Sequence, residues 1–221
     1  MNQNWWKILT VLLLLYTCIA GFLFTTPRLP ILNESIRNLY FHVPMWFGMI
    51  LILTASVVYS VLYLRNQKPI EDIRASQAAQ VGVFWGILGL LTGMIWAHYT
   101  WGKAWSNDVK QTSSAIALLI YLAYFILRDT IKDEQKKAGI SAVYNIYAYA
   151  AMIPLLFILP RLTDSLHPGN GGNPGFNAYD LDSNMRLVFY PAILAWTLLG
   201  WWIFTIKVRY IKVKNYLISK N

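Results

Sequence analysis

Tryptophans cluster in a short segment between two apolar runs. Residues 96–110 read WAHYTWGKAWSNDVK, so Trp96, Trp101 and Trp105 are followed closely by Asp108. If the chain is helical from Trp101 onward, spacings of four and seven residues place Trp101, Trp105 and Asp108 on one face. Two indoles and a carboxylate would then form a flat amphipathic surface. Such a surface is typical both of a ligand platform and of the aromatic belt at a membrane interface, and these residues alone leave both interpretations open.

The three histidines add a second chemical feature. His42 lies in the segment YFHVP, His98 directly precedes the tryptophan cluster, and His167 lies in LHPG. Pro44 suits the first turn of a helix, which puts His42 close to that helix start. Each histidine alone is typical of an interfacial or solvated side chain. Two imidazoles from different segments beside an aromatic surface and cations favour haem, because iron takes axial imidazoles and the propionates take cations. The candidate cations are Arg28, Arg37, Lys103, Lys110, Arg161 and Arg186.

The composition indicates that these residues are positioned by membrane-spanning helices. The chain is 57% apolar and only 13% charged, whereas soluble domains average about 25% charged residues. Six apolar runs approach the roughly 20 residues needed to cross a bilayer. We therefore predict an all-α, polytopic membrane protein with one domain over residues 1–221. The runs are 8–24, 43–64, 81–97, 113–127, 142–159 and 187–206.

The first apolar run is expected to be a retained helix. It is longer than the 7 to 15 apolar residues at the centre of a signal peptide, and no small-x-small cleavage site follows it.

The distribution of cations predicts the orientation of these helices. Thirteen of the nineteen Lys and Arg residues lie in the N-terminal segment, the second and fourth connections and the C-terminal tail. Positive-inside bias therefore predicts that both termini are cytoplasmic. The outer segments are then about 25–42, 96–112 and 160–186, and they contain every histidine. The last of them includes the run Pro168–Gly175, which is rich in Gly and Pro and is not expected to form regular structure.

Several other functions are disfavoured. The net charge of +9 comes from basic residues at the ends of apolar runs, so no nucleic-acid partner is expected. Cys18 is the single cysteine, which excludes an intramolecular disulfide and a covalent haem attachment motif. No phosphate loop or metalloprotease motif occurs. Ionisable residues are nearly absent from the apolar runs, which argues against an ion pathway.

The third apolar run contains glycines at spacings of four, three and four residues. Small residues on one helix face allow close approach of another helix, so this stripe predicts helix packing. Its members are Gly82, Gly86, Gly89 and Gly93.

The motifs resemble a known family. The pattern Trp101-Gly-x-x-Trp105-x-x-Asp108 between the third and fourth helices resembles the tryptophan-rich WWD signature of haem-handling proteins. YFHVP and LHPG resemble the flanking histidine motifs of the haem exporter protein C family of cytochrome c maturation. The resemblance covers the whole chain in order and topology. One departure is Asn107, which stands where the family usually has another Trp.

The resemblance implies a role in haem delivery without enzymatic turnover. It implies that haem b is held transiently at the periplasmic face of the inner membrane and passed to a membrane-anchored haem chaperone. The implied neighbours are a haem-exporter ATP-binding cassette complex and a small single-helix partner. His42 and His167 correspond to the axial ligands of the haem iron, while His98 has no counterpart. The implied platform consists of Trp96, Trp101, Gly102, Trp105 and Asp108.

Two alternatives remain at this point. A cytochrome c synthase that attaches haem to apocytochrome would share the signature, but such proteins have additional helices and a second histidine pair inside the bilayer. A di-haem cytochrome b subunit would need histidines at the midplane of the membrane. The histidines of this chain all lie at the edges of apolar runs.

Overall fold

The computed structural model describes residues 4–167 and 181–220, and the helices of this part confirm the predicted fold class. Six helices are long and apolar enough to cross a membrane. Helices are the expected solution, because each backbone N–H and C=O is paired within its own segment and none faces lipid. The glycine- and proline-rich run 168–175 lies outside the described residues.

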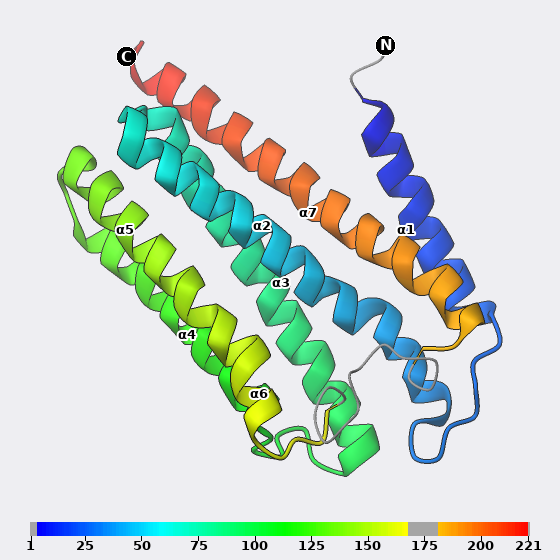
Figure 1. Cartoon of the computed structure of the whole chain (residues 1–221). Coiled ribbons are helices and arrows are strands. Elements are labelled where there is room, and N and C mark those ends of the chain that lie inside the picture. The colour runs from blue at the N-terminus through cyan, green and yellow to red at the C-terminus, as the bar shows by residue number, and fades with distance from the viewer. Residues whose placement is uncertain (1–3, 168–180, 221) are drawn as a thin grey trace.

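The helices form an elongated bundle with a central pair (Figure 1). Helices α2 and α3 lie side by side, the α4–α5 pair packs on one flank, and α7 packs on the other with α1 outermost. The start of α1 and the end of α7 lie at the same end of the bundle. The elements are α1 (Trp5–Leu23), η1 (Asn33–Asn38), α2 (Leu39–Asn66), α3 (Pro69–Trp101), α4 (Val109–Thr130), α5 (Glu134–Ile153), η2 (Pro154–Ile158), α6 (Leu159–Leu162) and α7 (Ser183–Ile218).

The glycine stripe of α3 is a packing surface, as predicted. A Cβ atom added at Gly82 would lie 2.6 Å from Leu53 of α2, and one added at Gly86 would lie 2.7 Å from the Met49 sulfur. Farther along α3, a Cβ atom added at Gly89 would meet the Trp46 ring, and one added at Gly93 would meet the His42 ring. The stripe therefore lets large α2 side chains lie directly on the α3 backbone.

Helix α3 begins twelve residues before its apolar run. Pro69 occupies the first turn, where its missing N–H costs nothing, and Glu71 and Asp72 follow at the positive end of the helix dipole. Asp72 also accepts two hydrogen bonds from Arg128 of α4, the longer at 2.6 Å. This paired carboxylate and guanidinium join α3 to α4 at the end of the bundle that carries the chain termini.

Polar side chains also join helices inside the bundle. Asn145 of α5 is fully buried and donates to Ser56 and Ser60 of α2 at 2.7 and 2.8 Å. In a low-dielectric interior such hydrogen bonds fix the rotation of one helix against the other. The α4–α5 pair is thus fastened to the central helices from both α3 and α2.

The packing role of the glycine stripe can be tested with two alanine substitutions. Gly82→Ala should lower the free energy of unfolding by about 1–3 kcal/mol, because Leu53 is buried and cannot move aside. A Cβ added at Gly139 of α5 meets no atom within 4 Å, so Gly139→Ala should be neutral or stabilise by up to about 1 kcal/mol. Thermal unfolding in detergent compares the two, and equal effects would contradict close packing at Gly82.

Candidate functional site

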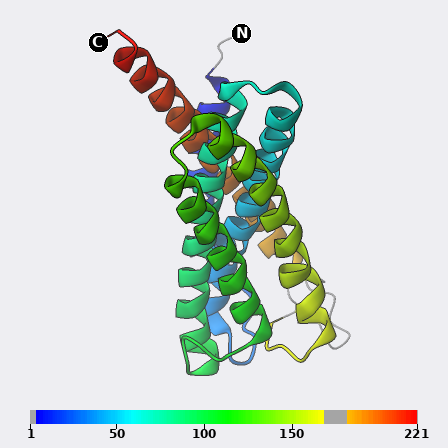
Figure 2. The ribbon, with the colours of Figure 1, turned by 90° about the vertical axis from the view of Figure 1, so that its left-hand side faces the viewer.

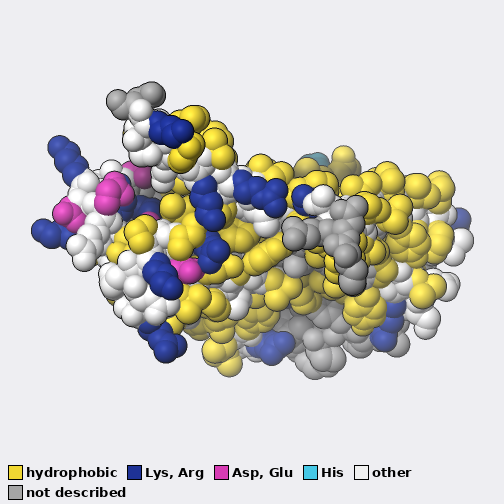
Figure 3. Space-filling model, turned by 90° about the horizontal axis from the view of Figure 1, so that it is seen from above, with side chains coloured by type: hydrophobic (Ala, Val, Ile, Leu, Met, Phe, Trp, Pro, Cys, Tyr) yellow, Lys and Arg dark blue, Asp and Glu magenta, His cyan; other side chains and the backbone are white. Residues whose placement is uncertain are grey.

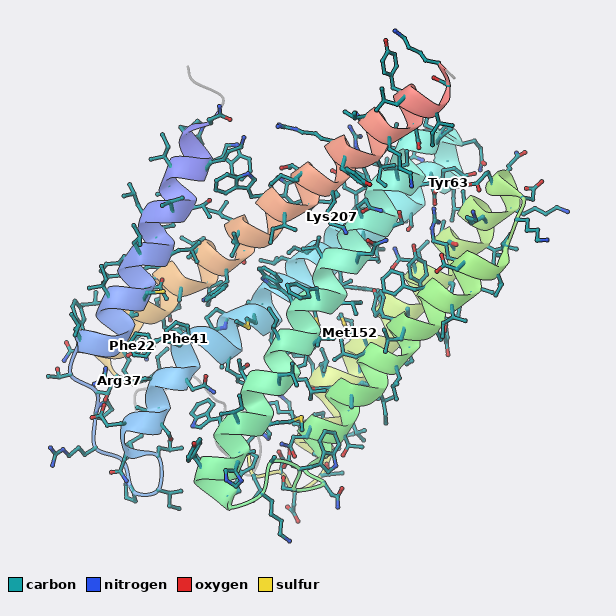
Figure 4. The ribbon with its side chains drawn as sticks, turned by 180° about the vertical axis from the view of Figure 1, so that it is seen from behind. Phe22, Arg37, Phe41, Tyr63, Met152 and Lys207 are labelled. Atoms are coloured by element: carbon teal, nitrogen blue, oxygen red, sulfur yellow. The ribbon has the colours of Figure 1, made fainter. Side chains whose placement is uncertain are left out.

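A cavity of about 500 Å³ opens at the end of the bundle away from the chain termini. It lies between α2, α3, α4 and the η2–α6 segment, and its walls are mostly apolar. Its size is within the range of roughly 300–1,000 Å³ typical of small-molecule sites. The same end carries Arg37, with Phe22 and Phe41 close by, whereas Tyr63 lies at the opposite end (Figure 4). Four predicted site residues line the cavity: His42, Trp96, Trp101 and His167.

The backbone of α3 holds the His42 ring in place. Its Nδ1 atom lies 2.9 Å from the Gly89 carbonyl oxygen, and a carbonyl only accepts hydrogen bonds. Nδ1 therefore carries the proton, and Nε2 carries the lone pair of the neutral ring. A Cβ atom added at Gly93 would lie 2.6 Å from the imidazole, so only glycine leaves room for this ring. Trp46 and Trp96 contact it edge-on, with ring centroids at 6.3 and 5.9 Å.

Asp108 connects two segments that are distant in sequence. Its carboxylate accepts hydrogen bonds from the Lys110 N–H, from the Ser165 hydroxyl and Leu166 N–H, and from His167. These four bonds match the roughly four lone-pair sites of an ionised carboxylate. Burial alone would raise the pKa of Asp108, but the hydrogen bonds from His167, Leu166 and Ser165 outweigh it and hold this pKa well below its ordinary value.

His167 is oriented by that carboxylate. Its Nδ1 atom lies 2.8 Å from Asp108 Oδ1, and Trp101 packs edge-on against the imidazole at a centroid distance of 4.8 Å. Because ionised Asp108 only accepts, Nδ1 of His167 carries a proton and Nε2 keeps the lone pair in the neutral ring. Histidines that bind metal commonly donate their other ring N–H to a carbonyl or carboxylate. Both cavity histidines have this arrangement.

The predicted continuous helix face from Trp101 to Asp108 is wrong. Helix α3 ends at Trp101, because Gly102 adopts a left-handed conformation with φ of 74°. Asp108 is instead the N-cap of α4, so its role is to hold α4 and His167 and not to extend an indole surface. Trp105 lies between the helices, 37% exposed. Neither Trp105 nor Gly102 is among the residues that line the cavity.

Asn107, where the sequence departs from the signature that it resembles, has a local structural role. Its φ of 56° is in the left-handed region, where Asn is more readily accommodated than most residues. Its side-chain oxygen accepts a hydrogen bond from the Trp105 indole at 2.9 Å. Asn107 therefore turns the chain into α4 and fixes the neighbouring indole.

The sequence interpretation missed several residues of the site. Trp46 lies one helical turn after His42, and this spacing of four could have identified it. Gln111 accepts from both the Ser106 N–H and its hydroxyl and donates to the Ala104 carbonyl, which fastens the α3–α4 connection. Of the six candidate cations, Lys110 and Arg161 line the cavity.

Other polar candidates lie away from the cavity. Arg37 donates to the carbonyls of Gly21 and Phe24, which fastens the α1–α2 connection. His98 is exposed, its ring contacts Tyr99, and it is not among the lining residues.

The fifth membrane helix is interrupted where it reaches the cavity. Pro154 lacks an N–H, and the chain forms a π-helical turn over Pro154–Ile158 before the short α6. Such wider turns occur frequently at functional sites. Leu156 and Phe157 of this turn and Arg161 of α6 line the cavity. The interruption thus places both apolar and cationic side chains at the wall.

In the described part of the chain, six helices are long and apolar enough to cross a membrane, and one end of their bundle holds a mostly apolar cavity with two oriented histidines. These features define an integral membrane protein with a cavity at one end. The sequence profile of the family described as "Heme exporter protein C" matches residues 1–221. The chain therefore belongs to the heme exporter protein C family.

Individual relatives agree with this assignment. "Heme exporter protein C" of Rhodobacter capsulatus is 31% identical over 166 residues, which cover 75% of this chain and 68% of that protein. The protein of the same description from Paracoccus denitrificans is 29% identical over 146 residues, covering 66% and 61%. A "Putative cytochrome c biosynthesis ccmC-like mitochondrial protein" of Marchantia polymorpha is 35% identical over 135 residues, covering 61% and 56%. The aligned region thus spans about two thirds or less of each relative.

The double role of Asp108 predicts a specific effect of its removal. Asp108→Ala should cost about 1 kcal/mol for the lost helix cap and should also raise amide hydrogen exchange at Ser165–His167. Asp133 caps α5 through the Lys136 N–H, so Asp133→Ala is the matched control. It should lose only the helix-cap contribution of about 1 kcal/mol and leave exchange at Ser165–His167 unchanged. Unchanged exchange in the Asp108 variant as well would refute the proposed connection.

Proposed function

We propose that this protein binds haem in the cavity through His42 and His167 and delivers it for the maturation of c-type cytochromes. The observation that carries the proposal is that both imidazoles form the same kind of hydrogen bond through Nδ1. Each Nδ1 is committed to an oxygen acceptor, Gly89 for one ring and Asp108 for the other. Each Nε2 thereby keeps the lone pair that an iron ligand needs. Haem accepts two such ligands on opposite faces of one macrocycle.

The remaining walls suit the other parts of a haem molecule. Trp46, Trp96 and Trp101 supply aromatic surface for the macrocycle, and the cavity is of the size that drug-like and cofactor ligands need. Lys110 and Arg161 are cations at the same cavity and can form charge-assisted hydrogen bonds with the propionates. That Trp105 contacts haem stays a prediction. Because Trp105 is exposed, it would lie at the rim of the site.

The cation distribution supports a periplasmic position for the cavity. With both termini cytoplasmic, as positive-inside bias predicts, the cavity end faces the periplasm of the inner membrane. From there haem b, bound transiently, would pass to a membrane-anchored haem chaperone. A haem-exporter ATP-binding cassette complex and a small single-helix protein are the further partners in this proposal. The His167 side chain is 24% exposed, which suits a ligand that must be released.

The histidine content favours delivery over covalent attachment. A relative described as "Cytochrome c biogenesis protein CcsA" from Pelargonium hortorum is 30% identical over 93 residues, but these cover only 29% of that protein. A synthase of that kind would need a second histidine pair within the bilayer. The chain has three histidines in all, and the third, His98, is exposed. We therefore propose a carrier without catalytic residues.

Removal of either proposed axial ligand should abolish stable haem binding. Purified wild-type protein should acquire a Soret band when titrated with haem, whereas His42→Ala and His167→Ala should each lose most of it, because one iron ligand is gone. His98→Ala is the control and should bind like the wild type, since His98 lies outside the cavity. A wild type that acquires no Soret band, or histidine variants with unchanged spectra, would refute the proposed ligands.

The two cavity cations should recognise the propionates. Lys110→Gln and Arg161→Gln should each weaken haem binding about tenfold or more, since a hydrogen bond to a charged group contributes roughly 1.5–3 kcal/mol. Exposed Lys103 does not line the cavity, so Lys103→Gln serves as control. Titration with haem dimethyl ester, which lacks propionate charge, should remove the difference between variants and wild type. A loss that persists with the ester would contradict this assignment.

A further inference from the structure

Helix α7 is far longer than a membrane crossing requires. It contains 36 residues, or roughly 54 Å of helix at 1.5 Å per residue, against a hydrocarbon thickness of about 30 Å. Trp6 of α1 and Trp202 of α7 mark the membrane interface, because their rings meet at 6.1 Å and the Lys7 ammonium lies 5.7 Å from both. The last turns of α7 continue past this level and project beyond the other helices (Figure 2).

An apolar stripe runs along this projecting part. Ile206, Tyr210, Val213 and Leu217 recur at spacings of four, three and four residues, which places them on one helix face. They are 52%, 63%, 57% and 56% exposed, respectively. Val208, on the opposite face, is buried against the bundle. The stripe therefore faces away from the protein.

Cations border this stripe on both sides. At 100° per residue, Lys207 and Lys214 fall along one edge, and Arg209 falls along the other. Lys212 lies farther round on the second side, and residues 207–221 contain no Asp or Glu. Lys and Arg side chains are spread over this end of the molecule (Figure 3). A helix with an apolar face flanked by cations is typical of segments that lie in the interface of an anionic membrane.

Orientation by positive-inside bias does not account for this pattern. That bias requires cations near the membrane but neither a continued helix nor an apolar stripe. We propose that, on a membrane, residues 206–218 of α7 bend from the line of the helix onto the surface opposite the cavity and bind the head groups of anionic phospholipids. The apolar stripe enters the interface, and the bordering cations contact the head groups. This contact fixes the tilt and rotation of α7, which packs against both α1 and α2.

Nitroxide accessibility tests the proposal on the full chain in vesicles. In a Cys18→Ser background, spin labels are placed at Val213→Cys on the stripe and at Asn215→Cys on the opposite, exposed face. Vesicles of phosphatidylcholine alone are compared with vesicles that also contain phosphatidylglycerol. With phosphatidylglycerol, the label at position 213 should become severalfold less accessible to a water-soluble nickel chelate and more accessible to oxygen. The label at position 215 should stay accessible to nickel in both.

A charge variant separates head-group binding from simple apolar insertion. Replacing Lys207, Arg209, Lys212 and Lys214 by Gln should abolish the dependence on phosphatidylglycerol. Thermal unfolding should stay nearly unchanged, because Lys207 is only partly buried and the other three side chains are exposed. Equal burial of position 213 in both lipids would overturn head-group recognition. If the label at position 213 stays accessible to the nickel chelate in both kinds of vesicle, the proposed membrane contact is wrong. Protection that arises only on addition of a cytosolic protein fraction would overturn the proposal in favour of a protein partner.

Discussion

The cavity depends on the carboxylate of Asp108. Its side chain is only 1% exposed, and among the described residues it binds the first turn of α4 and the segment Ser165–His167 at once. Those segments are more than fifty residues apart, so no local preference brings them together. Burial of a carboxylate costs folding free energy unless hydrogen-bond donors satisfy its lone pairs. Here those donors belong to the start of α4 and to Ser165–His167, so the same hydrogen bonds hold these two segments in place. One electrostatic requirement thus orients His167 and closes that side of the cavity.

The opposite wall of the cavity depends on the glycines of α3, which have no side chain. Helices α2 and α3 approach closely because Gly82 and Gly86 make room for α2 side chains, and the same stripe continues to the cavity. There Gly89 supplies a carbonyl to His42 and Gly93 supplies the space beside its ring. The packing of the bundle and the orientation of this imidazole therefore have one cause. His42 is placed by a rigid helix pair, whereas His167 is placed by a single carboxylate.

The sequence predicted the helices and two histidines, His42 and His167, that the structure brings to one cavity, but not the local path between α3 and α4. Apolar runs and the glycine spacing are periodic signals, and both were reliable. The proposed helix through Trp101 and Asp108 failed because Gly102 could continue or end a helix, and helical spacing alone does not decide this. An Asp before the apolar run of α4 was the overlooked cap signal. Contacts such as Asp108 with His167, or Lys110 beside Arg161 at one cavity, depend on tertiary packing that no spacing encodes.

In the proposed haem complex, two imidazoles bind one iron, and a hydrogen bond from each Nδ1 orients the ring. Electron paramagnetic resonance of the ferric haem complex tests this most directly, because spin state and ligand couplings report the axial atoms. Ligation by both histidines predicts a low-spin signal with hyperfine couplings from two imidazole nitrogens in the wild type, and loss of this signal in both the His42→Ala and the His167→Ala variants. A high-spin signal in the wild type, or a low-spin signal that survives unchanged without one of these histidines, would contradict it.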